Sequence, residues 1–182
     1  DSILVTAKTD LDFLKSKYVK HQHIKWYIIY NFPSSIKQNK IINIKNKYDI
    51  PENQKLIVYQ GVIQYNRGIS MLIKLINTSD SFSAIIIGDG PALNQYKTIV
   101  SQKNLKNKVY FLGMIPYLNM LSYTAGCDIG WLMIKSTGIS NQFALPNKLF
   151  EYTLMGLPVV ASNLPNIEPI IKKNDFGLCV NE

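Results

Sequence analysis

Short apolar runs and amphipathic segments alternate along most of the chain. After residue 54, the expected strands are 56–59, 82–87, 109–112, 128–133, 159–162 and 178–180, each short and apolar. The segments between them predict helices over 68–77, 92–101, 117–123, 147–155 and 167–172; Ile69, Leu72, Ile73 and Ile76 form the apolar stripe of the first. Strands that are apolar on both faces and alternate with helices indicate an α/β fold, a parallel sheet with helices on both faces.

The first part of the chain shows a shorter version of this alternation. We expect a strand over 2–6, a helix over 10–18 with Asp10 as N-cap, and a strand over 24–30 that ends before Pro33. The stretch 34–54 is rich in lysine and asparagine and predicts a hinge or linker. The predicted organisation is therefore the end of one domain over 1–33, a linker over 34–54 and a second domain over 55–182.

The net charge of +8 is spread along the chain, and Arg67 is the single arginine among 20 basic residues. Because no cluster of aromatic residues and arginines is present, nucleic-acid binding is disfavoured. Lysines beside aromatic residues over 15–20 and 25–27 fit peripheral contact with an anionic membrane surface, although a solvated face has the same pattern. No apolar run approaches the ~18 residues of a membrane span.

The cysteines and histidines point away from metal chemistry. Cys127 and Cys179 each lie among apolar residues, which predicts buried thiols and a reducing, cytoplasmic compartment. His21 and His23 have no cysteine or carboxylate near them in sequence, so we expect no metal site of the zinc type.

Loops that follow parallel strands meet at one edge of the sheet, where such sheets bind ligands. Gly61 opens the loop after the first strand of the regular part, and a glycine there permits close approach of a ligand to the backbone. Arg67 stands just before the next helix, and a guanidinium can grip a diphosphate with two parallel hydrogen bonds. The alternative for Arg67 is an exposed charge on a turn.

The next two strands also end at glycines. Gly88 and Gly90 lack the third glycine of a dinucleotide-binding motif, so a tight turn lining a cleft is favoured over a nicotinamide site. Gly113 is followed by Met114 and Ile115, whose backbone groups beside an apolar wall suit the edge of a flat heterocyclic base.

A helix beginning near Pro146 would point free backbone N–H groups at the same edge. Asn147 and Lys148 lie in its first turn, where an anion is favoured and Lys148 adds positive charge. Glu151 lies one turn further on the same face, placed to accept hydrogen bonds from sugar hydroxyls. The alternative for Glu151 is a simple favourable interaction with the helix dipole.

Together these segments resemble the C-terminal, donor-binding domain of a retaining GT-B glycosyltransferase of the group 1, or family four, type. The matching segments are 59–61 with 66–68, 86–91, 109–113, 125–128, 147–152 and 156–162, in family order. The resemblance implies a Rossmann-like sheet and places 1–33 at the end of the N-terminal, acceptor-binding domain. It also implies that the chain stops before the closing helices, so we expect a fragment that is inactive in transfer when alone.

The resemblance implies a binding site for a nucleoside diphosphate-sugar. Arg67 matches the basic residue that holds the diphosphate, and the amides of Asn147 and Lys148 match the helix N-terminus that meets the phosphate. An arginine usual directly after the loop glycine is Val62 here, which leaves Arg67, Lys148 and the helix amides for the diphosphate.

The nucleoside is expected to contact three further positions. The backbone at Met114 and Ile115 matches the base contact, and Glu151 matches the second carboxylate of a paired-glutamate motif, which binds the ribose. The first carboxylate of that motif is replaced by Phe143.

Three side chains are candidates to replace the missing carboxylate in holding the donor sugar: Asn141, Gln142 and Lys148.

The resemblance implies transfer of a hexose-type sugar, with retention and without a tightly bound metal or other cofactor, to a polysaccharide or glycolipid acceptor. Arg67, Lys148 and Glu151 are the expected catalytic residues. Such an enzyme is expected in the bacterial cytoplasm or at the inner face of the membrane. Two alternatives stay open: a GT-B-like nucleotide-sugar epimerase, and a non-catalytic nucleotide-binding domain. Glycoside hydrolysis is disfavoured because no carboxylates are paired at hydrolase spacing.

Overall fold

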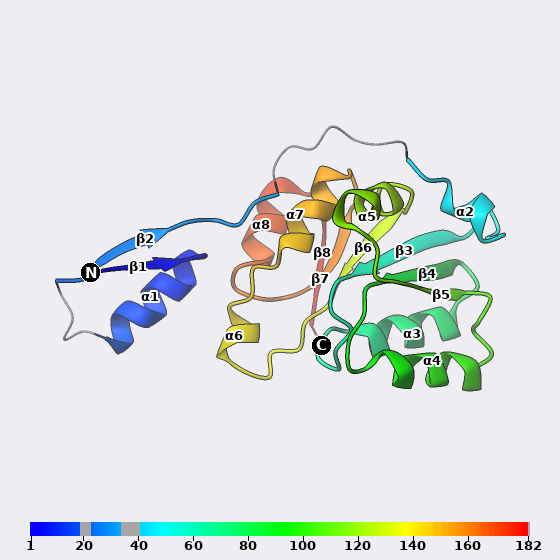
Figure 1. The fold of residues 1–182 in the computed structure, drawn as a ribbon, viewed down its shortest axis with the longest axis horizontal. Helices are drawn as coiled ribbons and strands as arrows, with labels where there is room; N and C mark the ends of the chain where they lie inside the picture. Colours follow the sequence, from blue (N-terminus) through cyan, green and yellow to red (C-terminus); the bar gives the residue numbers. More distant parts are fainter. Residues whose placement is uncertain (19–22, 34–40, 182) are drawn as a thin grey trace.

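The computed structural model describes residues 1–18, 23–33 and 41–181 and contains two parallel sheets (Figure 1). The small sheet pairs β1 (Ser2–Val5) with β2 (Lys25–Ile28), and α1 (Lys8–Lys17) lies between them in the chain. The large sheet has six strands: β3 (Lys55–Gln60), β4 (Phe82–Ile87), β5 (Val109–Gly113), β6 (Ile129–Leu132), β7 (Val159–Ser162) and β8 (Gly177–Val180).

The six strands are parallel and lie in the order β5-β4-β3-β6-β7-β8. This order is that of a Rossmann-like sheet, which confirms the predicted fold class. The chain runs outward from β3 to one edge and then returns to place β6 on the other side of β3. Ligands of such sheets bind at the carboxyl ends of the two strands that flank this switch point.

Helices cover both faces of the large sheet. In Figure 1, α3 (Ile69–Thr78) and α4 (Leu93–Gln102) lie below it, and α5 (Tyr117–Thr124), α7 (Asn147–Leu154) and α8 (Glu168–Asn174) lie on the other side. Residues of β3 alternate between the two cores: Leu56 and Val58 pack with α7 and α8, whereas Ile57 and Tyr59 pack with α3 and α4. Strands that are apolar on both faces, as the sequence predicted, therefore contribute side chains to two separate cores, one on each face of the sheet.

The structure corrects two details of the predicted elements. The helix expected to begin at Asp10 begins at Lys8 after Ala7, so Asp10 is not the N-cap; it lies in the first turn and accepts a hydrogen bond from Thr6. Two helices were not expected, α2 (Ile44–Lys47) and α6 (Ile139–Gln142). Each is about one turn long, which is too short to produce a periodic apolar pattern.

Part of the expected linker packs into the large domain. Residues 34–40 lie outside the described residues, but Ile44 and Ile50 are buried in the same apolar core as Leu56 and Val58. The many lysines and asparagines of this stretch led to the linker prediction, although Ile41, Ile42 and Ile44 lie close together in sequence. The domain boundaries at 33 and 54 remain predictions.

The small sheet contacts the large domain through α1 and the segment after β2. The rings of Phe13 and Phe143 lie 5.8 Å apart, and Asn166 donates a hydrogen bond to Thr9 over 2.7 Å. Phe32 meets Phe150 edge-on, with ring centres 4.7 Å apart.

The thiols of Cys127 and Cys179 are free and half-buried, whereas we expected them to be buried. Burial raises the pKa of both thiols.

Within residues 1–18, 23–33 and 41–181, no helix has the length and apolar character needed to cross a bilayer. His21 lies outside these ranges, and the residues within them form no group of three or more His, Cys, Asp or Glu side chains able to hold a metal ion.

Candidate nucleotide-binding site

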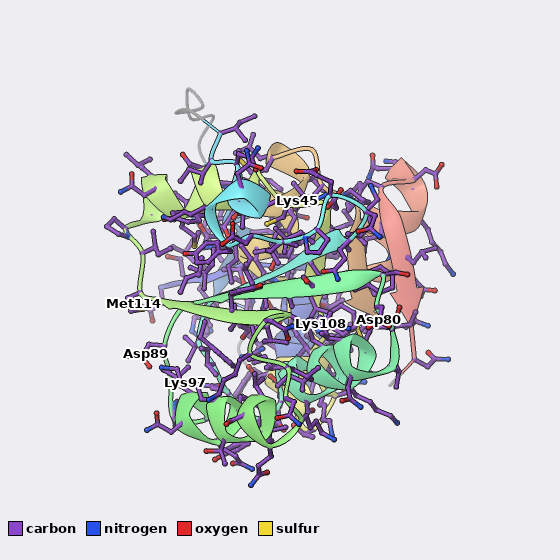
Figure 2. All side chains as sticks on the ribbon, turned by 90° about the vertical axis from the view of Figure 1, so that its right-hand side faces the viewer. Lys45, Asp80, Asp89, Lys97, Lys108 and Met114 are labelled. Atoms are coloured by element: carbon purple, nitrogen blue, oxygen red, sulfur yellow. The ribbon has the colours of Figure 1, made fainter. Side chains whose placement is uncertain are left out.

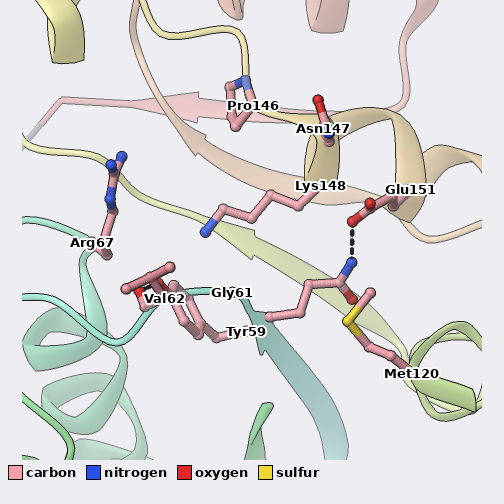
Figure 3. Close-up of a pocket in the computed structure, with 10 residues that line it drawn as sticks. Tyr59, Gly61, Val62, Arg67, Met120, Pro146, Asn147, Lys148 and Glu151 are labelled. Atoms are coloured by element: carbon pink, nitrogen blue, oxygen red, sulfur yellow. Dashed lines mark hydrogen bonds between the residues drawn. The ribbon is translucent and has the colours of Figure 1, made fainter. Parts of the chain in front are cut away.

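A cavity of about 370 Å³ lies at the carboxyl end of β3, beside the switch point of the sheet (Figure 3). Residues from β3, the loop after it, α5 and the start of α7 line this cavity: Tyr59, Gln60, Gly61, Val62, Arg67, Met120, Pro146, Asn147, Lys148 and Glu151. The fold thus brings together five residues predicted from sequence, namely Gly61, Arg67, Asn147, Lys148 and Glu151.

A second cavity of about 170 Å³ adjoins the first and shares Gly61, Val62 and Met120 with it. Its other lining residues are the last residue of β4 and residues that follow β4 and β5: Ile87, Gly88, Asp89, Met114 and Ile115. Figure 2 shows Asp89 and Met114 at the same end of these strands. The backbone positions predicted for a heterocyclic base therefore lie beside the predicted anion-binding residues.

Three glycines bring the strand ends close together. Gly61 donates its N–H to Ile87 over 2.9 Å, and Gly88 donates to Gly113 over the same distance. Gly88 has a φ of +132°, and a Cβ at this position would lie 2.0 Å from the carbonyl oxygen of Gly61. Only glycine permits this approach. Gly113 and the nearby Gly90 line neither cavity and instead shape these loops.

Arg67 reaches the cavity because the chain turns sharply after it. Gly68 adopts a left-handed conformation with φ +68° directly before α3, and Trp131 donates its indole N–H to the Gly68 carbonyl over 3.0 Å. Arg67 is half-buried, and its guanidinium lies on the side of the cavity toward which the amine of Lys148 extends (Figure 3).

Lys148 crosses the cavity from α7 and ends over the ring of Tyr59, with Nζ 4.1 Å from the ring centre. The pKa of Lys148 is lowered to about 7, mainly by burial and also by the positive charge of Arg67, whereas Glu151 acts in the opposite direction. Two cationic side chains thus converge on one space, and an anion placed between them would relieve their repulsion.

The first turn of α7 opens toward the same cavity. Pro146 precedes the helix in an extended conformation, and no side chain caps the helix start. The first N–H groups of a helix have no partner within it, so those of Asn147 and Lys148 are available to a ligand. The predicted helix extended to residue 155 and the structure ends it at Leu154, with Gly156 following at φ +76° as expected.

Glu151 lies at the opposite side of the cavity from Arg67 and is only 7% exposed. Gln60 donates from Nε2 to Glu151 Oε2 over 2.5 Å, and Thr124 donates to Gln60 Oε1 over 2.6 Å. Burial raises the pKa of Tyr117, and so do the charge of Glu151 and a hydrogen bond to it. The carboxylate therefore receives donors from β3 and α5.

Sequence reasoning missed Tyr59, Gln60 and Met120 as lining residues. The predicted strand ended at Tyr59 and left Gln60 to the following loop, whereas in the structure both belong to β3 and are buried. The available signal was their position at the end of the first strand of the large sheet, which borders the switch point. Met120 lies mid-helix on α5 and carried no such signal.

Phe143, which replaces the first carboxylate of the resembled motif, lies away from the cavity. It directly follows α6, its ring contacts Phe13, and its carbonyl accepts a hydrogen bond from Asn166 over 2.7 Å. Among the candidate substitutes, Lys148 lines the cavity, whereas Asn141 and Gln142 do not.

The model of the family described as "Glycosyl transferases group 1" matches residues 40–182. Alpha-monoglucosyldiacylglycerol synthase of Streptococcus pneumoniae is 24% identical over 146 residues, which are 78% of this chain and 32% of that protein. The putative teichuronic acid biosynthesis glycosyltransferase TuaC of Bacillus subtilis is 26% identical over 136 residues, 74% of this chain and 31% of that protein. The chain spans about a third of the length of these curated relatives.

Solved structures share the fold at low identity. Anabaena HepE in complex with UDP-glucose superposes with a TM-score of 0.76 at 17% identity, covering 98% of this chain and 49% of that one. Sucrose-phosphate synthase from Thermosynechococcus elongatus superposes with a TM-score of 0.76 at 17% identity, covering 100% of this chain and 45% of that one. The family match covers most of the chain, and these neighbours have its fold: the chain belongs to the glycosyl transferases group 1 family, with a Rossmann-like domain of the GT-B type.

Proposed function

We propose that this chain supplies the donor-binding part of an enzyme that transfers a sugar from a nucleoside diphosphate-sugar to an acceptor, with retention. One observation carries the proposal: Arg67, Lys148 and the start of α7 surround one end of a cavity whose other end holds Glu151. A pyrophosphate at the cationic end would leave the attached ribose beside Glu151. The adjoining cavity near Met114 and Ile115 would then take the base.

The cationic end can also assist the reaction. As the bond from the sugar to the pyrophosphate breaks, negative charge gathers on the departing nucleoside diphosphate. Arg67, Lys148 and the amides of the α7 first turn are already aimed at that position, so they stabilise the developing charge without rearranging. These groups supply the positive charge that a divalent metal could otherwise provide, and we therefore expect donor binding to persist in the presence of EDTA.

The names of relatives support particular partners. HepE was solved with UDP and with UDP-glucose, which makes UDP-glucose the first donor to test. TuaC and the O-antigen biosynthesis glycosyltransferase WclY act in surface-polysaccharide synthesis by name, and the S. pneumoniae relative is named for a glycolipid product. We therefore propose a polysaccharide or lipid-linked acceptor at the inner face of a bacterial membrane.

Isothermal titration calorimetry with UDP-glucose tests donor binding. Arg67→Ala and Glu151→Ala should each weaken binding by at least about tenfold, since a charged hydrogen bond contributes roughly 1.5–3 kcal/mol. Lys97→Ala is the control, because Lys97 lies on α4 and lines neither cavity. No binding of any nucleoside diphosphate-sugar by the unsubstituted chain would contradict the proposal.

A second candidate is a nucleotide-binding domain without transferase chemistry, which the position of Phe143 favours. The resembled family places a carboxylate there, whereas this chain uses the position to contact Phe13. Donor binding without sugar transfer to any acceptor would support this candidate. Conversion of free nucleotide-sugar without acceptor would instead indicate the epimerase alternative.

A further inference from the structure

Glu151 is oriented by a side chain from another element. Gln60, the last residue of β3, donates from Nε2 to Glu151 Oε2 over 2.5 Å (Figure 3). Gln60 is 2% exposed and Glu151 is 7% exposed, so water can replace little of this contact. The hydrogen bond therefore restrains the direction of the carboxylate at the edge of the cavity.

The hydrogen-bond partners of the Gln60 side-chain amide determine which way its NH₂ group and its oxygen point. A carboxylate only accepts hydrogen bonds, so the Gln60 NH₂ group must face Glu151 and its oxygen must face the other way. That oxygen meets the hydroxyl of Thr124, which donates to it over 2.6 Å. Thr124 is fully buried. The three side chains thus form a chain of hydrogen bonds with one consistent direction, running from Thr124 through Gln60 to Glu151.

This arrangement leaves acceptor capacity for a ligand. A carboxylate can accept about four hydrogen bonds, and Gln60 and Tyr117 account for two. The group that fits the remaining positions has donors on neighbouring carbons, as the 2′ and 3′ hydroxyls of a ribose do. An amide donor also leaves the carboxylate charge unneutralised, and a charged acceptor gives the stronger hydrogen bond.

We propose that Gln60, itself held by Thr124, is a positioning residue that fixes the Glu151 carboxylate toward the cavity and thereby sets a preference for ribonucleotides over analogues lacking the ribose hydroxyls. The inference rests on the proposed function, because it assumes that a nucleotide enters this cavity. Gln60 acts through Glu151 and needs no contact of its own with the ligand.

Calorimetry on the full 182-residue chain tests this with three probes: UDP, 2′,3′-dideoxyuridine diphosphate and inorganic pyrophosphate. The unsubstituted chain should prefer UDP over the dideoxy analogue by about tenfold or more, as expected for charge-assisted hydrogen bonds. Gln60→Leu should bring this ratio close to one and leave pyrophosphate affinity unchanged, because Arg67 and Lys148 stay in place. Thr124→Val, at a position that does not itself line the cavity, should lower the ratio in the same direction.

The chain offers a matched control. Gln54 is also a buried glutamine whose side-chain oxygen accepts a hydroxyl hydrogen bond, from Ser83 over 2.5 Å, but it precedes β3 at the opposite end of the sheet. Gln54→Leu should keep the wild-type ratio, which separates positioning from a general loss of stability.

The outcomes are distinguishable. If Gln60→Leu and Thr124→Val both fold and keep the wild-type ratio while Glu151→Gln loses it, the inference is wrong and the proposed function stands. If the unsubstituted chain binds neither UDP nor pyrophosphate, the proposed function is wrong, and the inference that rests on it is wrong as well. A ratio near one in Gln60→Leu but not in Gln54→Leu supports the inference.

Discussion

The amine of Lys148 lies 4.1 Å from the centre of the Tyr59 ring, on the wall of the larger cavity. The ring stabilises a cation through its negative face, a contribution of roughly 0.5–2 kcal/mol. Burial and Arg67 oppose the positive charge on Lys148 and lower its pKa to about 7. The ligand-free site is thus poised between a charged and a neutral lysine, and an anionic ligand would favour the charged form.

Binding of UDP-glucose should therefore weaken as pH rises above 7. With a free-state pKa of about 7 for Lys148, a bound pyrophosphate raises the pKa, so binding takes up a proton above that pH. Affinity should be constant with respect to this group below its free-state pKa and fall by up to about tenfold per pH unit above it. Lys148→Arg should remove this dependence, since arginine stays charged; an equally steep profile in Lys148→Arg would contradict the assignment.

The same lysine makes folding depend on pH. Because its pKa is lowered from 10.5 to about 7 in the folded chain, the unfolded chain binds more protons between these values. The contribution of Lys148 to the free energy of unfolding should therefore rise with pH across this window. Urea unfolding of the chain and of Lys148→Met at several pH values measures it, and identical pH profiles would argue against a lowered pKa.

We expect the hydroxyl of Tyr59 to stabilise the fold, and its ring both to stabilise the fold and to support donor binding. Tyr59→Phe keeps the ring beneath Lys148 and loses the hydrogen bond to the Val62 carbonyl, now 2.6 Å long, so we expect a loss of about 1 kcal/mol in the free energy of unfolding. Tyr59→Leu also removes the ring from a fully buried site and should cost about 2–4 kcal/mol. Only Tyr59→Leu should further weaken UDP-glucose binding near pH 7. Equal binding losses in the two variants would show that the ring does not support Lys148.

Gly88→Ala should be strongly destabilising, by about 2 kcal/mol or more, because φ is +132° and the new Cβ would lie 2.0 Å from the Gly61 oxygen. Gly138→Ala is the control: its backbone is extended, with φ −176°, and no atom lies within 4 Å of a Cβ built there. That change should be neutral or stabilising by up to about 1 kcal/mol. Urea unfolding compares the two, and similar effects would be inconsistent with the backbone contact between Gly61 and Gly88.

Phe143→Ala should loosen the contact between α1 and the large domain. It removes an aromatic pair with Phe13, which contributes about 0.5–1.5 kcal/mol beyond the buried area. Amide hydrogen exchange over residues 8–17 should become faster, and UDP-glucose affinity should stay unchanged because Phe143 does not line the cavity. Phe143→Leu, which retains an apolar side chain, should show a smaller effect. A clear loss of UDP-glucose affinity in Phe143→Ala would place this residue in the donor site instead.

Local pattern was sufficient for most of the architecture. The predicted strand 82–87 has the same bounds in the structure. The helical spacing of apolar residues such as Ile69 and Leu72 identified the buried face of α3. Parallel strands make their loops converge, so the loop glycines, Arg67 and Glu151 could be assigned to one edge before any coordinates.

Tertiary structure decided which side chains meet at that edge. Gln60 and Glu151 stand 91 positions apart and touch because the strand order places β3 beside the strand that α7 covers. The pKa of Lys148 likewise depends on burial and on Arg67, and neither can be read from neighbours in sequence. The sequence therefore determined the fold, through short-range periodicity and the chirality of strand connections. It also indicated the sheet edge at which we propose that the donor binds. The orientation and charge of the groups in the cavity come from contacts between distant segments, which only the packed fold creates.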